Sequence, residues 1–138
     1  MTDAQDPTTP TTPIARLRNV VLDCPRPREL AEFYAQVIGG TIEDDGDWID
    51  LVAEGRVKVS FQQVEGLRPP EWPRSDVNAQ QIHLDLDAGR TDEEIDAAQE
   101  KVLALGARPL DLDDDGGKRD FRVYADPAGH PFCLCKIP

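Results

Sequence analysis

The sequence contains one pattern of residues twice. The stretch 19–24 (NVVLDC) resembles the stretch 83–88 (HLDLDA). Each stretch precedes an amphipathic helical pattern that stops at glycine, and short β-type stretches follow. Self-similarity of this kind predicts two copies of one small module packed together. The copies differ at an informative position, because the second has His83 where the first has Asn19.

Both copies predict the element order βαβββ. The first helix is indicated by apolar residues at i, i+3, i+4 and i+7, and the second begins with the capping box Thr91-Asp92-Glu93-Glu94. The expected strands are 18–24, 41–43, 48–52 and 57–64 in the first copy, and 81–87, 108–112, 121–125 and 132–137 in the second.

We therefore expect an α+β fold, in which two tandem βαβββ modules form an incomplete barrel of curved mixed sheet with the helices outside. A ligand cleft would lie inside. The 138 residues suffice for one domain. We predict a disordered tail at 1–16 and a single domain at 17–137. Within the domain we expect module one at 17–64, a Pro-rich connection at 65–79, and module two at 80–137.

Charge and composition exclude some functions. With 15 Lys and Arg against 27 Asp and Glu, the net charge of −12 argues against a nucleic-acid partner. Solubility explains this charge most simply, and a preference for cationic ligands is the sharper alternative. No apolar run suggests a membrane span or a leader, and three cysteines make no disulfide framework. We expect a cytoplasmic protein without a membrane partner.

Strand alternation separates two faces of the expected sheets. Apolar residues share the parity that faces the helices: Val20, Leu22, Ile49, Leu51, Val57, Val59, Phe61, Ile82, Leu84, Leu86, Phe132 and Leu134. The opposite parity is polar and rich in acids: Asn19, Val21, Asp23, Trp48, Asp50, Lys58, Ser60, Gln62, His83, Asp85, Asp87, Cys133 and Cys135. A polar interior face needs water, a ligand or mutual hydrogen bonds, so this face is the expected ligand site.

Several motifs resemble the vicinal oxygen chelate superfamily, and its glyoxalase-like subgroup in particular. They are Phe33-Tyr34, the stretch 80–86 (QQIHLDL), the stretch 105–107 (LGA) and the stretch 124–133 (YADPAGHPFC). The resemblance covers about residues 17–137, and the turn Asp126-Pro127-Ala128-Gly129 is its most specific part. The superfamily includes glyoxalase I, extradiol dioxygenases, fosfomycin-resistance enzymes and bleomycin-resistance proteins.

In metal-dependent members, the resemblance implies ligands on the first and last strands of each module. The matching positions are Asn19, Ser60 or Gln62, His83 and Cys133. Only His83 is a usual ligand of the family, and a catalytic zinc needs three good protein ligands. We therefore predict no cofactor and disfavour a divalent metal. If a metal binds, His83 and Cys133 would hold it.

Two functions remain open. The first is a binding module that resembles bleomycin-resistance proteins and sequesters a small organic ligand. The incomplete set of metal ligands favours this function, and the acidic composition makes a cationic ligand the more specific alternative. Its expected ligand-binding residues are Asn19, Trp48, Asp50, Ser60, Gln62, His83, Asp85 and Cys133. We expect a homodimer.

The second function is an enzyme, a lyase, isomerase or dioxygenase-type protein, with His83 and Asp85 as catalytic residues. Cys133 would be a nucleophile if His83 lay within hydrogen-bonding reach, and otherwise an inert buried thiol. The alternative for His83 is a histidine satisfied by its neighbours. Trp72, in the connection, either caps the cleft, packs at a dimer contact or anchors the loop.

Overall fold

The computed structural model describes residues 9–10, 12, 17–72 and 82–138. Most of the tail predicted at 1–16 and residues 73–79 of the predicted connection lie outside the described residues. No described helix is long and apolar enough to cross a membrane.

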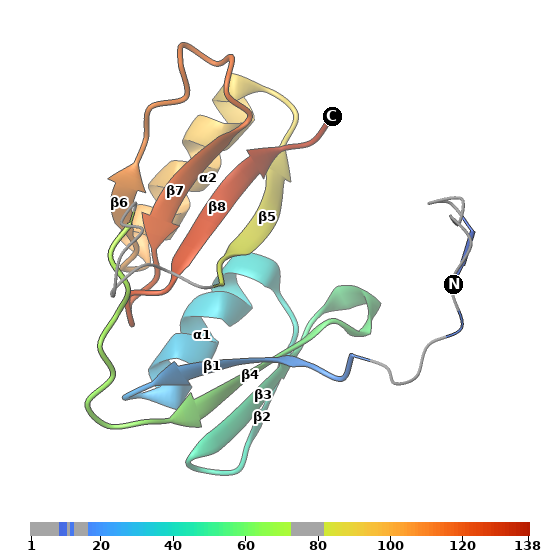
Figure 1. The fold of residues 1–138 in the computed structure, drawn as a ribbon, viewed down its shortest axis with the longest axis vertical. Helices are drawn as coiled ribbons and strands as arrows, with labels where there is room; N and C mark the ends of the chain where they lie inside the picture. The colour runs from blue at the N-terminus through green and yellow to red at the C-terminus, as the bar shows by residue number, and fades with distance from the viewer. Residues whose placement is uncertain (1–8, 11, 13–16, 73–81) are drawn as a thin grey trace, which may run out of the picture.

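The two predicted βαβββ modules are confirmed (Figure 1). Module one contains β1 (Val20–Cys24), α1 (Pro27–Ile38), β2 (Thr41–Asp44), β3 (Trp48–Val52) and β4 (Lys58–Gln63), with a short 3-10 helix, Glu54–Arg56, between β3 and β4. Module two contains β5 (Leu84–Gly89), α2 (Asp92–Ala104), β6 (Arg108–Asp111), β7 (Phe121–Ala125) and β8 (Pro131–Lys136).

Each module forms its own four-stranded sheet with the same topology. The strand orders are β1-β4-β3-β2 and β5-β8-β7-β6. In each sheet the first strand pairs in parallel with the last, and the other pairs are antiparallel. The described strands do not close a barrel, and β1 and β5 are outer strands of their sheets.

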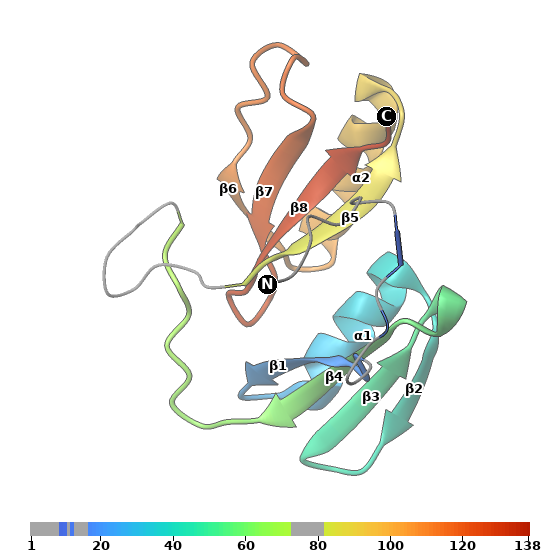
Figure 2. The same ribbon diagram turned by 45° about the vertical axis from the view of Figure 1, so that its right-hand side comes forward.

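Helix α1 joins the modules into one core. It lies between the two sheets in both ribbon views (Figures 1 and 2). Its Tyr34 ring stacks on Phe61 of β4 at a centroid distance of 5.8 Å, and its Phe33 ring lies 6.0 Å from Phe132 of β8. The apolar faces of both sheets therefore contact the same helix, and one continuous core contains residues of both modules.

The predicted strand alternation is largely confirmed. Most residues assigned to the helix-facing parity belong to the core or pack against it. The predicted helix-facing orientation is wrong for Val57 and Ile82, which have 57% and 67% of their surface exposed. Val57 immediately precedes β4, and Ile82 lies two residues before the first residue of β5, so the pleat of a strand does not fix the direction of either side chain.

The turn at Asp126 fastens module two to α1. Its carboxylate accepts hydrogen bonds from the backbone N–H groups of Ala128 and His130 at 2.9 Å, as expected for a residue that organises its own turn. The same carboxylate accepts the Tyr34 hydroxyl at 2.7 Å, with both residues fully buried. Burial raises the pKa of Asp126, although these donors act in the opposite direction.

Candidate functional site

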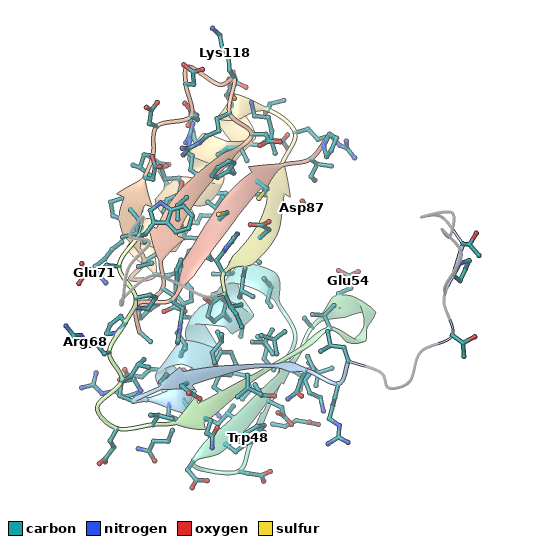
Figure 3. The ribbon with its side chains drawn as sticks, viewed as in Figure 1. Trp48, Glu54, Arg68, Glu71, Asp87 and Lys118 are labelled. Carbon is teal, nitrogen blue, oxygen red and sulfur yellow. The ribbon has the colours of Figure 1, made fainter. Side chains whose placement is uncertain are left out.

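The predicted polar residues lie on the face of each sheet opposite the helices, which we call the open face. They form two groups. The module-one group consists of Asn19, Asp50 and Ser60 with Trp48, and the module-two group consists of His83, Asp85 and Cys133. Figure 3 shows Trp48 on the lower module and Asp87, a neighbour of the module-two group on β5, on the upper one.

The structure brings the predicted module-two residues together. Donor atoms of His83, Asp85 and Cys133 lie within 4.8 Å of one another. Asp85 and Cys133 are direct partners in the β5–β8 ladder, and His83 Nε2 lies 3.2 Å from Asp85 Oδ1. Residues two apart in a regular strand would be too distant for this contact, at roughly 7 Å between Cα atoms. His83 precedes the first residue of β5, so its side chain can turn toward Asp85.

The three members differ in exposure. The side chains of Asp85 and His83 are 65% and 39% exposed, whereas Cys133 is only 2% exposed. Burial, followed by the charge of Asp85 and a hydrogen bond to it, raises the pKa of Cys133 to about 12. A protonated thiol is a poor nucleophile. The environment thus argues against a nucleophilic Cys133 and favours the inert buried thiol.

Trp72 lies beside the module-two group. Its ring lies edge-on to His83 at 6.0 Å between centroids. Its indole also lies near Asp111, whose pKa is lowered mainly by a hydrogen bond from Arg119 and slightly by Trp72. Asp111, Val123, Cys133 and Asp85 are successive ladder partners across the sheet. Trp72 therefore lies near both ends of this row, close to Asp111 at one end and to His83, the neighbour of Asp85, at the other.

The indole nitrogen of Trp72 is buried and forms no hydrogen bond to the residues that the structure describes. Although Trp72 lies close enough to Asp111 to affect its pKa, the two groups do not meet in hydrogen-bonding geometry. The connection is also packed against module two at Gly129, where an added Cβ would overlap Cβ of Pro69. The sequence suggested a cap as one role for Trp72 but did not identify it as a site residue, because the connection has no periodicity to orient its side chains.

The module-one group satisfies its own hydrogen bonds. Asn19 Nδ2 donates to Ser60 Oγ at 2.6 Å, and Ser60 Oγ donates to Asp50 Oδ1 at 2.5 Å. The indole of Trp48 also donates to Asp50, at 2.9 Å, and Lys58 lies 3.8 Å away as its ion-pair partner. The Ser60 hydrogen bond is the main cause of the lowered pKa of Asp50. Asn19 presents its amide nitrogen, which is no metal ligand, toward the group.

Gln62 is not brought into the module-one group. It lies opposite Trp48 in the β3–β4 ladder, one same-face position beyond Ser60, and it is exposed. Within the described part of the chain, no hydrogen bond joins its side chain to Asn19, Asp50 or Ser60. Of the two alternatives left open for β4, Ser60 is therefore the residue that contacts Asn19.

The donor sets of the two modules differ in their suitability for a metal. Imidazole, carboxylate and thiolate are all ligands of Zn²⁺, so His83, Asp85 and Cys133 fit a three-ligand site within module two. Binding would have to displace the Cys133 proton. In the module-one group, Asn19 and Ser60 offer an amide and a hydroxyl, and the Asp50 carboxylate is already bonded to Ser60, Trp48 and Lys58.

Two large cavities lie among the described residues on the helix side of the sheets. One, of about 510 Å³, is lined by α1, β5 and α2, and includes Leu86 and Lys101. The other, of about 580 Å³, lies along α1 and includes Phe33 and Ile42. Neither is lined by His83 or Cys133, so neither is the cleft expected on the open face.

Solved structures share this fold at low sequence identity. Fosfomycin resistance protein FosX from Mesorhizobium loti is 15% identical with a TM-score of 0.64, covering 91% of this chain and 94% of that one. A mutant of FosX from Listeria monocytogenes, complexed with Mn(II) and 1S,2S-dihydroxypropylphosphonic acid, is 15% identical with a TM-score of 0.63, covering 91% and 94%. A possible glyoxalase from Bacillus cereus is 10% identical with a TM-score of 0.62, covering 87% and 97%.

No curated protein matches the chain. The model of the glyoxalase-like domain family, however, matches residues 19–135, which include both modules and both polar groups. The paired βαβββ modules, the family match and these structural neighbours agree with the resemblance found in the motifs. The chain therefore belongs to the glyoxalase-like domain family and has the fold of the vicinal oxygen chelate superfamily.

Proposed function

We propose that the protein binds a small organic cation on the open face of module two. The observation that carries this proposal is the exposed Asp85 carboxylate beside His83, whose ring lies 6.0 Å from the Trp72 ring. A carboxylate attracts an ammonium group, and an aromatic ring interacts favourably with a cation or with a flat apolar group. Asp87, exposed on the same face, and the net charge of −12 add to the attraction.

Each of these groups would make a different contribution to binding. Asp85 supplies charge, and His83 supplies a polar ring that contacts both Asp85 and Trp72. Cys133 and its ladder partner Val123 are buried between Asp85 and Asp111 in the sheet. The module-one group, whose hydrogen-bonding groups already contact each other, contributes no comparable free charge. The proposed activity is binding and sequestration, which requires no bond to be made or broken.

Calorimetry with phenethylamine and 2-phenylethanol tests this proposal, because the two compounds share a phenylethyl group and differ in charge. An exposed ion pair with a cation–π contact contributes about 1 kcal/mol, so we expect about fivefold tighter binding of the amine. Asp85→Asn should abolish this preference. Asp23→Asn, which removes an exposed carboxylate from the open face of module one, should leave it unchanged. Equal binding of both compounds by the unmodified protein contradicts the proposal.

The three donors of module two favour a second candidate, a metal-dependent enzyme. His83, Asp85 and Cys133 would hold the ion, and a bound zinc would supply a Lewis acid next to an open coordination position. Metal analysis of protein purified without chelator distinguishes the candidates. One equivalent of zinc, lost in both His83→Ala and Cys133→Ala proteins, supports the enzyme. Metal-free protein that binds phenethylamine supports the binding module.

A further inference from the structure

We propose that the cavity between α1, β5 and α2 binds a monocarboxylate with an apolar tail. The cavity has a volume of about 510 Å³, which falls within the range of small-molecule sites, roughly 300–1,000 Å³. It lies on the other side of β5 from the open-face site, and Asp85 of β5 borders both. The inference does not depend on the proposed function.

The walls of the cavity are mainly apolar. On α1 they are formed by Val37 and Ile38, on α2 by Ala98 and Val102, and just after α2 by Leu105. On β5, Leu86 and Ala88 have the helix-facing parity and pack against the core. Asp85 and Asp87 have the opposite parity, and the carboxylate of Asp85 lies beside His83 and Cys133 on the open face. We therefore infer that Asp85 and Asp87 line the cavity with their backbone atoms. A hydrocarbon tail matches such walls.

Three charged residues line the cavity, namely Lys101 on α2 and Asp85 and Asp87 on β5. Lys101 is the one cationic residue among those lining the cavity. The positions three and four residues away along the chain are alanine or leucine, so α2 offers it no i,i+3 or i,i+4 ion pair. No ion pair joins Lys101 to any of the residues that the structure describes.

Lys101 is exposed, so its ammonium group is accessible to a ligand at the cavity. Gln36 lines the same cavity and offers an amide N–H donor. A carboxylate can pair with Lys101 and accept from Gln36 while its tail enters the cavity. An alcohol of the same length would keep the tail contacts but lose the ion pair, and an ammonium head group would meet Lys101 as a like charge.

Binding of decanoate and 1-decanol to the full-length protein tests the proposal by calorimetry. An ion pair at the rim of a cavity is worth about a fivefold change in affinity, so decanoate should bind about fivefold more tightly than 1-decanol. Lys101→Gln should weaken decanoate to the level of 1-decanol and leave 1-decanol unchanged. Lys118→Gln is the matched control, because Lys118 lies in the β6–β7 loop at the far end of module two (Figure 3).

A second variant tests the location of the site. Ala98→Leu places a larger side chain at the cavity wall on a helical position that tolerates leucine, and it should weaken both compounds at least about fivefold. It should leave phenethylamine binding unchanged, whereas Asp85→Asn should alter phenethylamine binding alone. Equal binding of decanoate and 1-decanol by the unmodified protein, or unchanged decanoate binding in either the Lys101→Gln or the Ala98→Leu protein, overturns the proposal.

Discussion

At the scale of single residues, the chemistry of the open face depends on contacts between neighbouring side chains. Asp85 connects an exposed imidazole to a buried thiol, and it raises the pKa of that thiol in addition to the larger effect of burial. A neighbouring imidazolium would instead lower the pKa of a thiol. The raised pKa of Cys133 therefore reflects burial and the carboxylate rather than His83.

Replacing Asp85 by Asn should increase the reactivity of Cys133. The substitution removes a negative charge that disfavours the thiolate, so the pKa of Cys133 should fall from about 12 while remaining above its ordinary value because of burial. The rate of reaction with a disulfide reagent near pH 8 measures this effect in a Cys24→Ala, Cys135→Ser background. Asp87→Asn serves as control. Equal rates in the two variants would show that Asp85 does not set this pKa.

The Tyr34–Asp126 hydrogen bond should contribute to stability in a pH-dependent manner. Tyr34→Phe leaves a buried carboxylate with one donor fewer, at an expected cost of about 1–3 kcal/mol in free energy of unfolding. The pKa of Asp126, already raised by burial, should rise further. A carboxyl group with a raised folded-state pKa stabilises the fold below its ordinary pKa, and this contribution is lost as the pH increases.

The cost of Tyr34→Phe should therefore be larger near pH 7 than near pH 4, as measured by urea unfolding. Tyr124→Phe provides the comparison, because the Tyr124 hydroxyl donates to the neutral Gln99 amide at 2.6 Å in a partly buried position. Tyr124→Phe should lower the free energy of unfolding by less than Tyr34→Phe does. This loss should lack the pH dependence that comes from the Asp126 charge. A loss for Tyr34→Phe that is the same at both pH values would contradict the role assigned to the Asp126 charge.

At the scale of elements, alternation and helical periodicity predicted most of the modules. Ile49 and Leu51 of β3 and Phe132 and Leu134 of β8 occupy the buried face that their parity indicated. The same rules failed just before the strands at Val57 and Ile82, where no ladder fixes the side chain. They could not orient Trp72, because the connection belongs to neither period and its contacts depend on long-range packing.

The approach of the connection to the turn at Gly129 gives an element-scale prediction. Gly129→Ala should destabilise the fold, because φ is +99° and the new Cβ would overlap Pro69. Gly46→Ala is the matched control, with φ of +88° and open space around the new Cβ. The loss should be larger at Gly129 by about 1–3 kcal/mol, the usual cost of overpacking.

The same comparison can be followed by Trp72 fluorescence. Movement of Pro69 should change the emission of Trp72 in the Gly129→Ala protein and leave it unchanged in the Gly46→Ala protein. Equal losses of stability in urea, with identical emission spectra, would show that Pro69 does not hold the connection against module two.

At the scale of the whole molecule, the two modules share one topology and differ in the polar groups on their open faces. The sequence predicted the two similar modules, and it showed that position 19 carries Asn rather than a usual metal ligand. The arrangement of the modules was not predictable from the sequence, because it depends on side chains of α1 that contact both sheets. Nor could the sequence show that Ser60 rather than Gln62 contacts Asn19, since both have the same parity.

This difference explains why the proposed site is assigned to module two. In module one the polar groups form a connected set of hydrogen bonds with Asp50 at its centre. In module two a carboxylate and an imidazole remain exposed beside a buried thiol, with an aromatic ring at their side. Exposed charge beside an aromatic surface is the arrangement that recognises an organic cation.

The most direct test is a fluorescence titration with phenethylamine, because the protein has two tryptophans, one near each polar group. In Trp48→Phe protein, where Trp72 is the single tryptophan, we predict a saturable change in emission that Asp85→Asn weakens. In Trp72→Phe protein, where Trp48 remains, we predict no saturable change. A saturable response from Trp48 with none from Trp72 would contradict the assignment of the ligand site to module two.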